Sequence, residues 1–392
     1  MKSTGKPRLL FMTSVPFYQW RGSSIRIAFN VQAFAELGYQ VDLVTVPIGE
    51  TRDIPGVTIH RVANPFRQKD LPIGPSLAKA FFDVLIFFKA LRMARHHSYA
   101  VVHAVEEVGL LGLLIARITG ARAVFEKHSD PASHQDKALK NLVLALYRRV
   151  ETLVIRKTDA VIGTGEGLVN QALAVAPEQM VHHIFDIPSS LVEADVDRVK
   201  HIVDQVRQDP DEVIALYIGS FAVYQGIDLM FDSLPIALQA SPKLRLVVVG
   251  GTEEQIAERT AWLKEKGIES AVRFLGFIPP DHVPNYVAAA DILLSPRSSG
   301  INTPLKLLDY LKGGRAILAT DTLANRRIID EKVAILKAPS PKSFASGLVE
   351  LTVNAPRRKE LGRQGRKLIE KTYNFARFKL LLKNCYDKLH SS

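Results

Sequence analysis

The sequence predicts an α/β protein with two nucleotide-binding-type domains, and two observations support this. Its 392 residues exceed the length of one average domain. A strand, a glycine loop, a helix and another strand follow one another near residue 10, and the same order restarts near residue 213. This alternation is typical of a parallel sheet covered by helices. We therefore expect a first domain at 1–185, a linker at 186–212, a second domain at 213–370 and a final helix at 371–392.

The first domain is predicted from short apolar runs separated by segments with helical periodicity. A glycine loop containing Gly22 and Ser23 precedes a helix at Ile25–Leu37, which Gly38 ends. The loop lacks the Gly-x-Gly-x-x-Gly pattern of a dinucleotide site. The predicted strands are Arg8–Thr13, Val41–Val46, Val57–Val62, Tyr99–His103, Ala121–Phe125 and Asp159–Gly163. A plain tight turn is the alternative interpretation of the glycine loop.

One predicted helix, Ala78–Arg95, combines phenylalanines with Lys79, Lys89 and Arg92. Such a helix can pack on the sheet while its long basic side chains reach water. It can also lie against an anionic bilayer. Both interpretations stay open, because one helix can serve both purposes.

The segment Val181–Glu212 is irregular and charged, so we interpret it as the connection between domains. Asp209 and Asp211 imitate a metal-binding Asp-x-Asp, but no strand precedes them, and we expect a solvated turn. The second domain then begins with a strand at Val213–Ile218. A helix at Ile227–Ala240, strands at Leu244–Gly250 and Val272–Pro279, and a basic helical tail at Pro356–Leu389 follow.

The stretch Ser295–Gly314 carries the strongest functional signal. Asp291–Leu294 predicts a buried strand, Thr303 and Pro304 predict a helix start, and Gly313 predicts its end. A helix N-terminus at the carboxyl end of a strand suits an anion.

Charged side chains in this stretch suit a nucleotide sugar. Lys306 and Arg297 can reach a phosphate, whereas Asp309 can accept hydrogen bonds from hydroxyl groups. The alternative is a capped helix on whose surface Lys306 and Asp309 merely pair.

This stretch resembles the signature of family 4 retaining glycosyltransferases of GT-B fold. That family has two glutamates eight positions apart, and here Ile301 and Asp309 stand at those positions. The form Ser-Pro-Arg, then Asn-Thr-Pro-Leu-Lys, is similar to a subgroup associated with bacterial surface-polysaccharide clusters. The resemblance implies two Rossmann-like domains facing across a cleft, with a C-terminal helix that returns to the first domain.

The resemblance also implies roles for individual residues. Reaction-centre roles fall on His128, Lys306 and Arg297, with Glu126 and Asp130 as polar support for His128. Acceptor or phosphate contacts fall on Gly22, Ser23 and Arg26. Donor contacts fall on Gly219, Ser220, Gln225, Gly250, Phe277, Ile278, Asn302, Thr303, Leu305 and Asp309. Ser220 and Gln225 depart from the family, which has basic residues at both positions.

The resemblance implies transfer of a sugar, of hexosyl type, from a nucleoside-diphosphate sugar to a glycan or lipid-linked acceptor, with retention. It implies no metal and no other cofactor. The departures at Ile301, Ser220 and Gln225 motivate one alternative, a catalytically weak GT-B subunit that binds nucleotide or glycan. A sugar-nucleotide epimerase of the same fold is a second alternative. The single cysteine, Cys385, fits a reducing cytoplasm. We expect a cytoplasmic protein, with contact to an anionic inner membrane face and none to nucleic acid.

Overall fold

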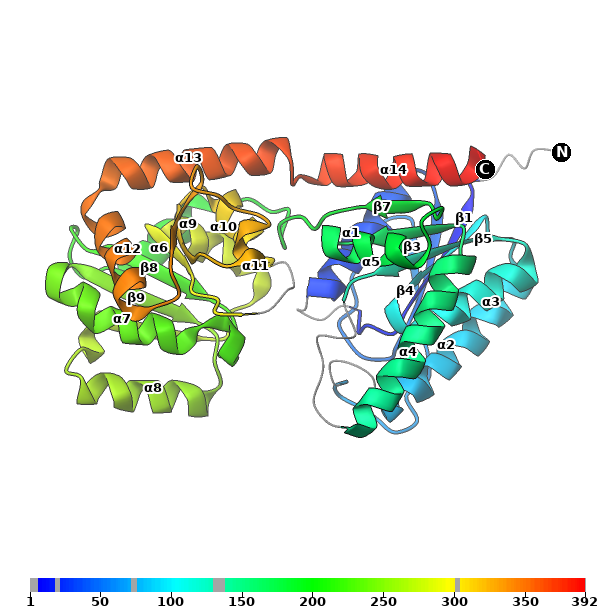
Figure 1. Ribbon diagram of the computed structural model, residues 1–392, viewed down its shortest axis with the longest axis horizontal. Coiled ribbons are helices and arrows are strands. Elements are labelled where there is room, and N and C mark those ends of the chain that lie inside the picture. The colour runs from blue at the N-terminus through cyan, green and yellow to red at the C-terminus, as the bar shows by residue number, and fades with distance from the viewer. Residues whose placement is uncertain (1–5, 18–21, 72–75, 130–137, 300–303, 392) are drawn as a thin grey trace. The chain divides into compact units, whose positions relative to one another are not determined.

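The computed structural model describes residues 6–17, 22–71, 76–129, 138–299 and 304–391 (Figure 1). The chain divides into two compact units. Unit 1 contains Met1–Asp186 and Phe375–Ser392, and unit 2 contains Ile187–Asn374. Each unit is a parallel sheet with helices on its faces, which confirms the predicted α/β class with two Rossmann-like domains.

Unit 1 has a seven-stranded sheet in the order β3-β2-β1-β4-β5-β6-β7, and every pair is parallel. Its strands are β1 (Arg8–Thr13), β2 (Gln40–Thr45), β3 (Val57–Arg61), β4 (Val101–Val105), β5 (Arg122–Lys127), β6 (Ala160–Gly163) and β7 (Val181–His183). Its helices are α1 (Gly22–Glu36), α2 (Leu77–His96), α3 (Gly109–Thr119), α4 (Ala138–Lys157), α5 (Glu166–Val175) and α14 (Phe375–Ser391), with the short η1 (Glu106–Val108) before α3.

Unit 2 repeats the same winding with six parallel strands in the order β10-β9-β8-β11-β12-β13. Its strands are β8 (Val213–Ile218), β9 (Leu244–Val249), β10 (Val272–Gly276), β11 (Ile292–Ser295), β12 (Ala316–Thr320) and β13 (Ala334–Lys337). Its helices are α6 (Val196–Val206), α7 (Ile227–Ala240), α8 (Glu253–Glu265), α9 (Val283–Ala289), α10 (Lys306–Gly313), α11 (Leu323–Arg326), α12 (Pro341–Val353) and α13 (Ala355–Lys371). Short η3 (Val223–Gln225), η4 (Glu269–Ala271) and η5 (Pro280–His282) turns join some of them.

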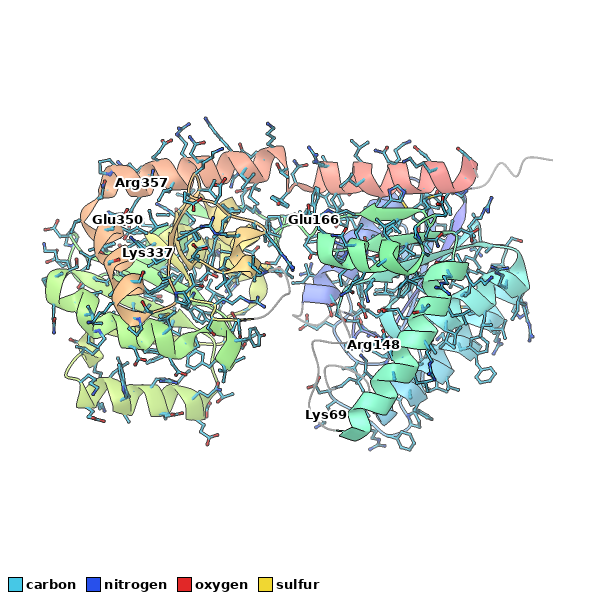
Figure 2. The ribbon with its side chains drawn as sticks, viewed as in Figure 1. Lys69, Arg148, Glu166, Lys337, Glu350 and Arg357 are labelled. Carbon is cyan, nitrogen blue, oxygen red and sulfur yellow. The ribbon has the colours of Figure 1, made fainter. Side chains whose placement is uncertain are left out.

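Both cores form between the sheet and its covering helices, because the central strands are apolar on both faces. In unit 1, Phe82 and Ile86 of α2 pack with Leu10 of β1 in one buried cluster. In unit 2, Phe231 of α7 and Phe344 of α12 are fully buried over β8 and β12. Figure 2 labels Lys337 and Glu350, which form an ion pair of 3.0 Å on the edge of unit 2.

The segment 181–212 is more regular than the sequence predicts. It contains β7 and the amphipathic helix α6, which Asp195 caps by accepting a hydrogen bond from the backbone N–H of Arg198 at 3.0 Å. Ile202 and Val206 are the buried residues of α6, which packs against α9 within unit 2. The apolar stripe of α6 is narrow and lies among many charged residues, so the sequence did not predict this helix. Asp211 lies in an exposed turn, as predicted, and pairs with Lys243.

Two helix boundaries also differ from the prediction. Helix α1 begins at Gly22, three residues early, where the Ser24 hydroxyl donates to the carbonyl of Pro16 at 2.7 Å. The basic tail forms two helices, α13 and α14, and the break between them coincides with the passage from unit 2 back to unit 1. Within unit 1, α14 packs on α1.

Candidate functional site

In unit 2 the strand order reverses between β8 and β11, and ligands of doubly wound sheets bind at such a reversal. The loops that follow these two strands touch there. The backbone N–H of Ser298 donates to the carbonyl of Tyr224 at 3.1 Å. A Cβ on Gly226 would lie 1.8 Å from the carbonyl oxygen of Pro296, and Gly226 has a φ of +72°. Only glycine allows the two loops to approach this closely.

The neighbouring loop after β9 closes on the same place. Gly250 has a φ of +113°, and a Cβ there would lie 2.1 Å from the carbonyl oxygen of Gly219. The predicted donor residues Gly219 and Gly250 are therefore adjacent, and their backbones lie at the carboxyl ends of β8 and β9. The backbone N–H groups of both glycines already have partners: Gly219 donates to the carbonyl of Val249 at 3.0 Å and Gly250 to the carbonyl of Gly276 at 2.7 Å.

Lys306, the first residue of α10, points into this turn. Its ammonium nitrogen lies 4.2 Å from the ring centroid of Tyr217 and 2.7 Å from where a Cβ on Gly219 would be. The nitrogen is shielded from solvent and has no hydrogen-bond partner among the residues that the structure describes. Burial, and then the nearby charge of Arg297, lower the pKa of Lys306 to about 7.

Arg297 supplies a second cation to the same turn. It is 7% exposed, its Nε donates to the carbonyl of Ser299 at 2.8 Å, and its guanidinium lies over the ring of Tyr224. Burial lowers the pKa of Arg297. Within the described ranges, neither Arg297 nor Lys306 forms an ion pair with a carboxylate. Two buried cations without a counter-charge favour an anionic ligand.

Asp309 does not pair with Lys306, so the alternative of a surface ion pair on this helix is wrong. One carboxylate oxygen, Oδ1, accepts hydrogen bonds from the backbone N–H of Ser189 at 2.7 Å and from its hydroxyl at 2.9 Å. Burial raises the pKa of Asp309 to about 6, although Ser189 opposes the shift. Asp309 thus anchors the segment after β7 to α10.

The remaining donor candidates lie around the same sheet edge. Helix α10 begins two residues after Pro304, with Leu305 at the N-cap and no side-chain cap. Ser220 is exposed and its carbonyl accepts from the Tyr217 hydroxyl, whereas Gln225 is half-buried. Phe277 and Ile278 follow β10, and Phe277 is 74% exposed. Asn302 and Thr303, together with Ile301, lie outside the described residues.

In unit 1, the predicted reaction-centre residue His128 belongs to a buried polar network around its predicted support, Glu126. Its carboxylate accepts from Nε of Arg26 at 2.5 Å, Nδ2 of Asn30 at 2.8 Å, and Nε2 of His103 at 2.7 Å and of His128 at 2.9 Å. Burial alone would raise the pKa of Glu126, but the Arg26 charge and these hydrogen bonds hold it well below its ordinary value. Glu126 therefore stays ionised.

His128 is fixed by this network while one ring nitrogen remains open. Its side chain is 6% exposed, and Nδ1 is shielded from solvent without a partner in the described part of the chain. The carboxylate of Glu106 accepts from the backbone N–H groups of His128 and of Ser129. Glu106 has a φ of +55°, which is strained for a residue other than glycine. This ring can exchange one hydrogen bond with a ligand through Nδ1. Asp130, the other predicted support, lies outside the described residues.

Arg26 differs from its prediction as an acceptor or phosphate ligand. It is 4% exposed, and its guanidinium also contacts Asp186 at 2.9 Å and the carbonyl of Ile184 at 2.8 Å. The guanidinium of Arg26 is thus bound by protein partners, and it holds the segment directly after β7 against α1. Gly22 and Ser23 are half-buried at the start of α1.

Sequence reasoning missed the roles of Glu106, Asn30 and His103 in this network. His103 is fully buried in β4 and its Nδ1 lies 2.8 Å from the hydroxyl of Tyr386 in α14. A histidine within an apolar strand was the available signal. Its partners are far away along the chain and cannot be identified from spacing.

Both halves of the chain match known glycosyltransferase families. Residues 21–182 match the glycosyl transferase 4-like domain, and residues 212–354 match the glycosyl transferases group 1. An uncharacterized glycosyltransferase of Methanocaldococcus jannaschii is 22% identical over 71% of this chain and 72% of its own length. The chitobiosyldiphosphodolichol beta-mannosyltransferase of Kluyveromyces lactis is 23% identical over 84% of this chain and 79% of its own.

Solved structures share the fold along nearly the whole chain. Sucrose-phosphate synthase from Thermosynechococcus elongatus has a TM-score of 0.75 at 18% identity, covering 98% of this chain and 100% of that one. HepE of Anabaena, in complex with UDP and glucose, has a TM-score of 0.74 at 13% identity, covering 97% and 100%. The two family matches identify the chain as a glycosyltransferase, and the shared architecture identifies its fold as GT-B.

Proposed function

We propose that this glycosyltransferase moves a hexosyl group from a nucleoside-diphosphate sugar to a glycan or lipid-linked acceptor, with retention, in the synthesis of a surface polysaccharide or glycoconjugate. The observation that best supports this proposal is the buried ammonium group of Lys306. A buried ammonium without a partner is costly unless a ligand supplies the missing negative charge. A diphosphate at the turn formed by Gly219 and Gly250 would supply it.

The same cations have a catalytic use in this proposal. When the bond between the sugar and the β-phosphate breaks, negative charge grows on the departing diphosphate. Lys306 and Arg297 stand ready to stabilise that charge at a site already shielded from water, where electrostatic stabilisation is strong. The ammonium of Lys306 takes the place of the two basic groups that are missing at Ser220 and Gln225.

The other donor groups receive roles from their chemistry. Phe277 offers an exposed aromatic face on which a nucleotide base can stack. Structural neighbours were solved with UDP and, in a starch synthase from Arabidopsis thaliana, with ADP, which supports a nucleoside diphosphate as the ligand class. His128 keeps its predicted role at the donor sugar, where Nδ1 would meet a hydroxyl group.

The test is transfer from a panel of nucleoside-diphosphate hexoses to glycan and lipid-linked acceptors, with and without a chelator. Retention is read from the anomeric configuration of the product by NMR. Lys306→Met should reduce transfer by about 10²–10³-fold, while Lys342→Met, which removes an exposed lysine of α12, should leave it unchanged. A product that is only an epimerised donor, or no transfer with any donor, would reject the proposal. Loss of activity with the chelator would reject metal independence.

A further inference from the structure

The buried carboxylate of Glu126 is saturated with hydrogen bonds. Its Oε1 accepts from Nε of Arg26 at 2.5 Å and from Nε2 of His128 at 2.9 Å. Its Oε2 accepts from Nδ2 of Asn30 at 2.8 Å and from Nε2 of His103 at 2.7 Å. A carboxylate offers about four lone-pair sites, and protein groups use all of them here. Glu126 therefore has no oxygen left for a substrate, and its role is to hold the side chains around it.

The saturated carboxylate decides which nitrogen of each histidine ring carries the proton. Glu126 is ionised, because Arg26 forms a buried ion pair with it. An ionised carboxylate only accepts hydrogen bonds, so the ring nitrogen that faces it must be the one that donates. The proton of the neutral ring therefore lies on Nε2 in both His103 and His128. In each ring this leaves Nδ1 with a lone pair that can accept a hydrogen bond.

Tyr386 of α14 fixes the far side of the His103 ring. Its hydroxyl lies 2.8 Å from Nδ1 of His103, and both side chains are buried. Burial raises the pKa of Tyr386 well above its ordinary value, so the hydroxyl keeps its proton and donates to Nδ1. The His103 ring also stacks on Phe11 at a centroid distance of 4.5 Å. Rotation of this ring would break two buried hydrogen bonds at once. Like every other helix among the described residues, α14 is not long and apolar enough to cross a membrane.

His128 lies at the other end of this series of hydrogen bonds and has one unused ring nitrogen. Its Nδ1 is shielded from solvent and has no partner within the described ranges. Glu126 holds the opposite nitrogen, while the carboxylate of Glu106 accepts from the backbone N–H groups of His128 and Ser129. Backbone and ring are thus both held, so Nδ1 has a defined direction. A ring nitrogen with a lone pair suits a ligand group that donates, such as a sugar hydroxyl, and disfavours a phosphate oxygen.

We propose that Tyr386 is a positioning residue of the reaction centre. Through His103 and Glu126 it holds His128 with the proton on Nε2, and Nδ1 accepts a hydrogen bond from a hydroxyl group of the bound sugar. The reaction centre of unit 1 thus depends on α14, the last helix of the chain, which packs on α1. The contact with a sugar hydroxyl rests on the proposed function, whereas the proton positions are a property of the protein alone.

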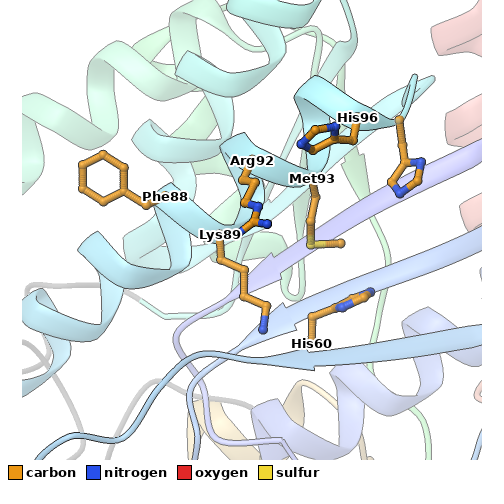
Figure 3. Close-up of a pocket in the computed structure, with 7 residues that line it drawn as sticks. His60, Phe88, Lys89, Arg92, Met93 and His96 are labelled. Atoms are coloured by element: carbon orange, nitrogen blue, oxygen red, sulfur yellow. The ribbon is translucent and has the colours of Figure 1, made fainter.

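A second buried tyrosine of unit 1 provides a matched control. The hydroxyl of Tyr99 donates to Oδ2 of Asp42 at 2.9 Å, and Oδ1 of Asp42 lies 2.8 Å from Nε2 of His60. His60 lines a hollow between α2 and β3 (Figure 3). In the part of the chain that the structure describes, no hydrogen bond joins this group to Glu126. Tyr99→Phe therefore removes a similarly buried hydroxyl without changing the reaction centre.

The first measurement is 15N NMR of the full chain with labelled histidines at about pH 8, without substrate. Ring nitrogens with and without a proton have well-separated chemical shifts, and the signals lost in His103→Gln and His128→Gln assign the two rings. We expect a proton on Nε2 and none on Nδ1 for both rings of the unchanged protein. Tyr386→Phe should move the ring signals of both histidines, whereas Tyr99→Phe should move neither.

Steady-state kinetics test the consequence for the reaction. Tyr386→Phe should lower kcat about tenfold, because the His128 ring loses its fixed orientation. Tyr99→Phe should keep the kcat of the unchanged protein, and thermal unfolding should show a similar loss of stability in both variants. His103→Gln, whose amide can still donate to Glu126, should keep more activity than His103→Leu.

Three results would overturn the proposal: a proton on Nδ1 of His128, unchanged His128 signals in Tyr386→Phe, or a normal kcat in that variant. If the unchanged protein transfers no sugar, the proposed function fails separately. The NMR signals then still decide whether Tyr386 positions His128, because they need no substrate.

Discussion

The buried ammonium nitrogen of Lys306 lies 4.2 Å from the ring centroid of Tyr217 and has no hydrogen-bond partner in the described part of the chain. A cation over an aromatic face gains some electrostatic stabilisation, but less than a lost hydration shell provided. The unliganded protein thus keeps a charge in an unfavourable place. A buried cation without a partner is expected at a site where a bound ligand supplies the opposite charge.

Replacing Lys306 by methionine should therefore separate stability from activity. We expect the free energy of unfolding at pH 7 to rise by about 2 kcal/mol, because a buried cation is removed and the side-chain length is kept. The turnover number kcat should fall by about 10²–10³-fold, because charge on the leaving diphosphate loses a partner. Chemical denaturation and steady-state kinetics measure the two effects. A variant with reduced stability and normal kcat would contradict this role for Lys306.

Donor binding should take up a proton above pH 7. The pKa of Lys306 is lowered to about 7 in the free protein, so at pH 8 most of the side chain is neutral. A bound diphosphate favours the ammonium form and raises this pKa. Calorimetric titration at pH 8 in buffers with different ionisation enthalpies should show proton uptake by the unchanged protein and none by Lys306→Met. At pH 6 the side chain of Lys306 is already mostly protonated, so donor binding should cause almost no proton uptake at position 306 in either protein.

His128→Ala should reduce kcat by about 10²-fold. It should also lower stability by about 1–2 kcal/mol, because the buried hydrogen bond between Nε2 and Glu126 is lost. His201→Ala, which changes an exposed histidine of α6, should leave kcat unchanged. Kinetics with the preferred donor and thermal unfolding of both variants provide the check. A normal kcat in His128→Ala would contradict the proposed role of this residue at the reaction centre.

Glu126→Gln should destabilise unit 1 by about 3 kcal/mol at pH 7, because Arg26 loses its buried carboxylate partner. The pKa of Glu126 is lower in the folded than in the unfolded protein. Its stabilisation is therefore complete above the unfolded pKa, near 4.5, and is lost as the pH falls toward the folded value. The variant should lack this part of the acid dependence. Glu360→Gln, at the exposed pair with Arg363, should leave the stability almost unchanged.

Two glycines with the same backbone conformation provide a matched comparison. Gly226 and Gly267 have φ values of +72° and +68°, but a Cβ on Gly226 meets the Pro296 carbonyl oxygen and one on Gly267 meets nothing within 4 Å. Gly267→Ala should cost about 1 kcal/mol, the cost of left-handed backbone alone. Gly226→Ala should cost more and should also raise the KM for the donor, because the two loops must separate. Equal effects of the two substitutions on stability and on KM would show that the loop contact at Gly226 contributes to neither.

Local patterns were sufficient to predict most of the fold. The helix Ile227–Ala240 and the strands Arg8–Thr13 and Val213–Ile218 have the predicted bounds, because apolar spacing and glycine stops act within a few residues. The same local evidence missed α6, whose apolar stripe is diluted by charged residues. It also put Thr303 and Pro304 at the start of a helix that begins at Lys306.

The sequence by itself determined the alternation of strands and helices, the two-domain class and the position of the Ser295–Gly314 motif at a strand end. Only the tertiary structure decided which polar groups find partners. Arg26 meets Glu126 across 100 residues and Asp309 meets Ser189 across 120, whereas Lys306 meets none among the described residues. Secondary structure follows from neighbours along the chain. Ionisation and hydrogen bonding depend on groups that only folding brings together, so no spacing rule could assign them.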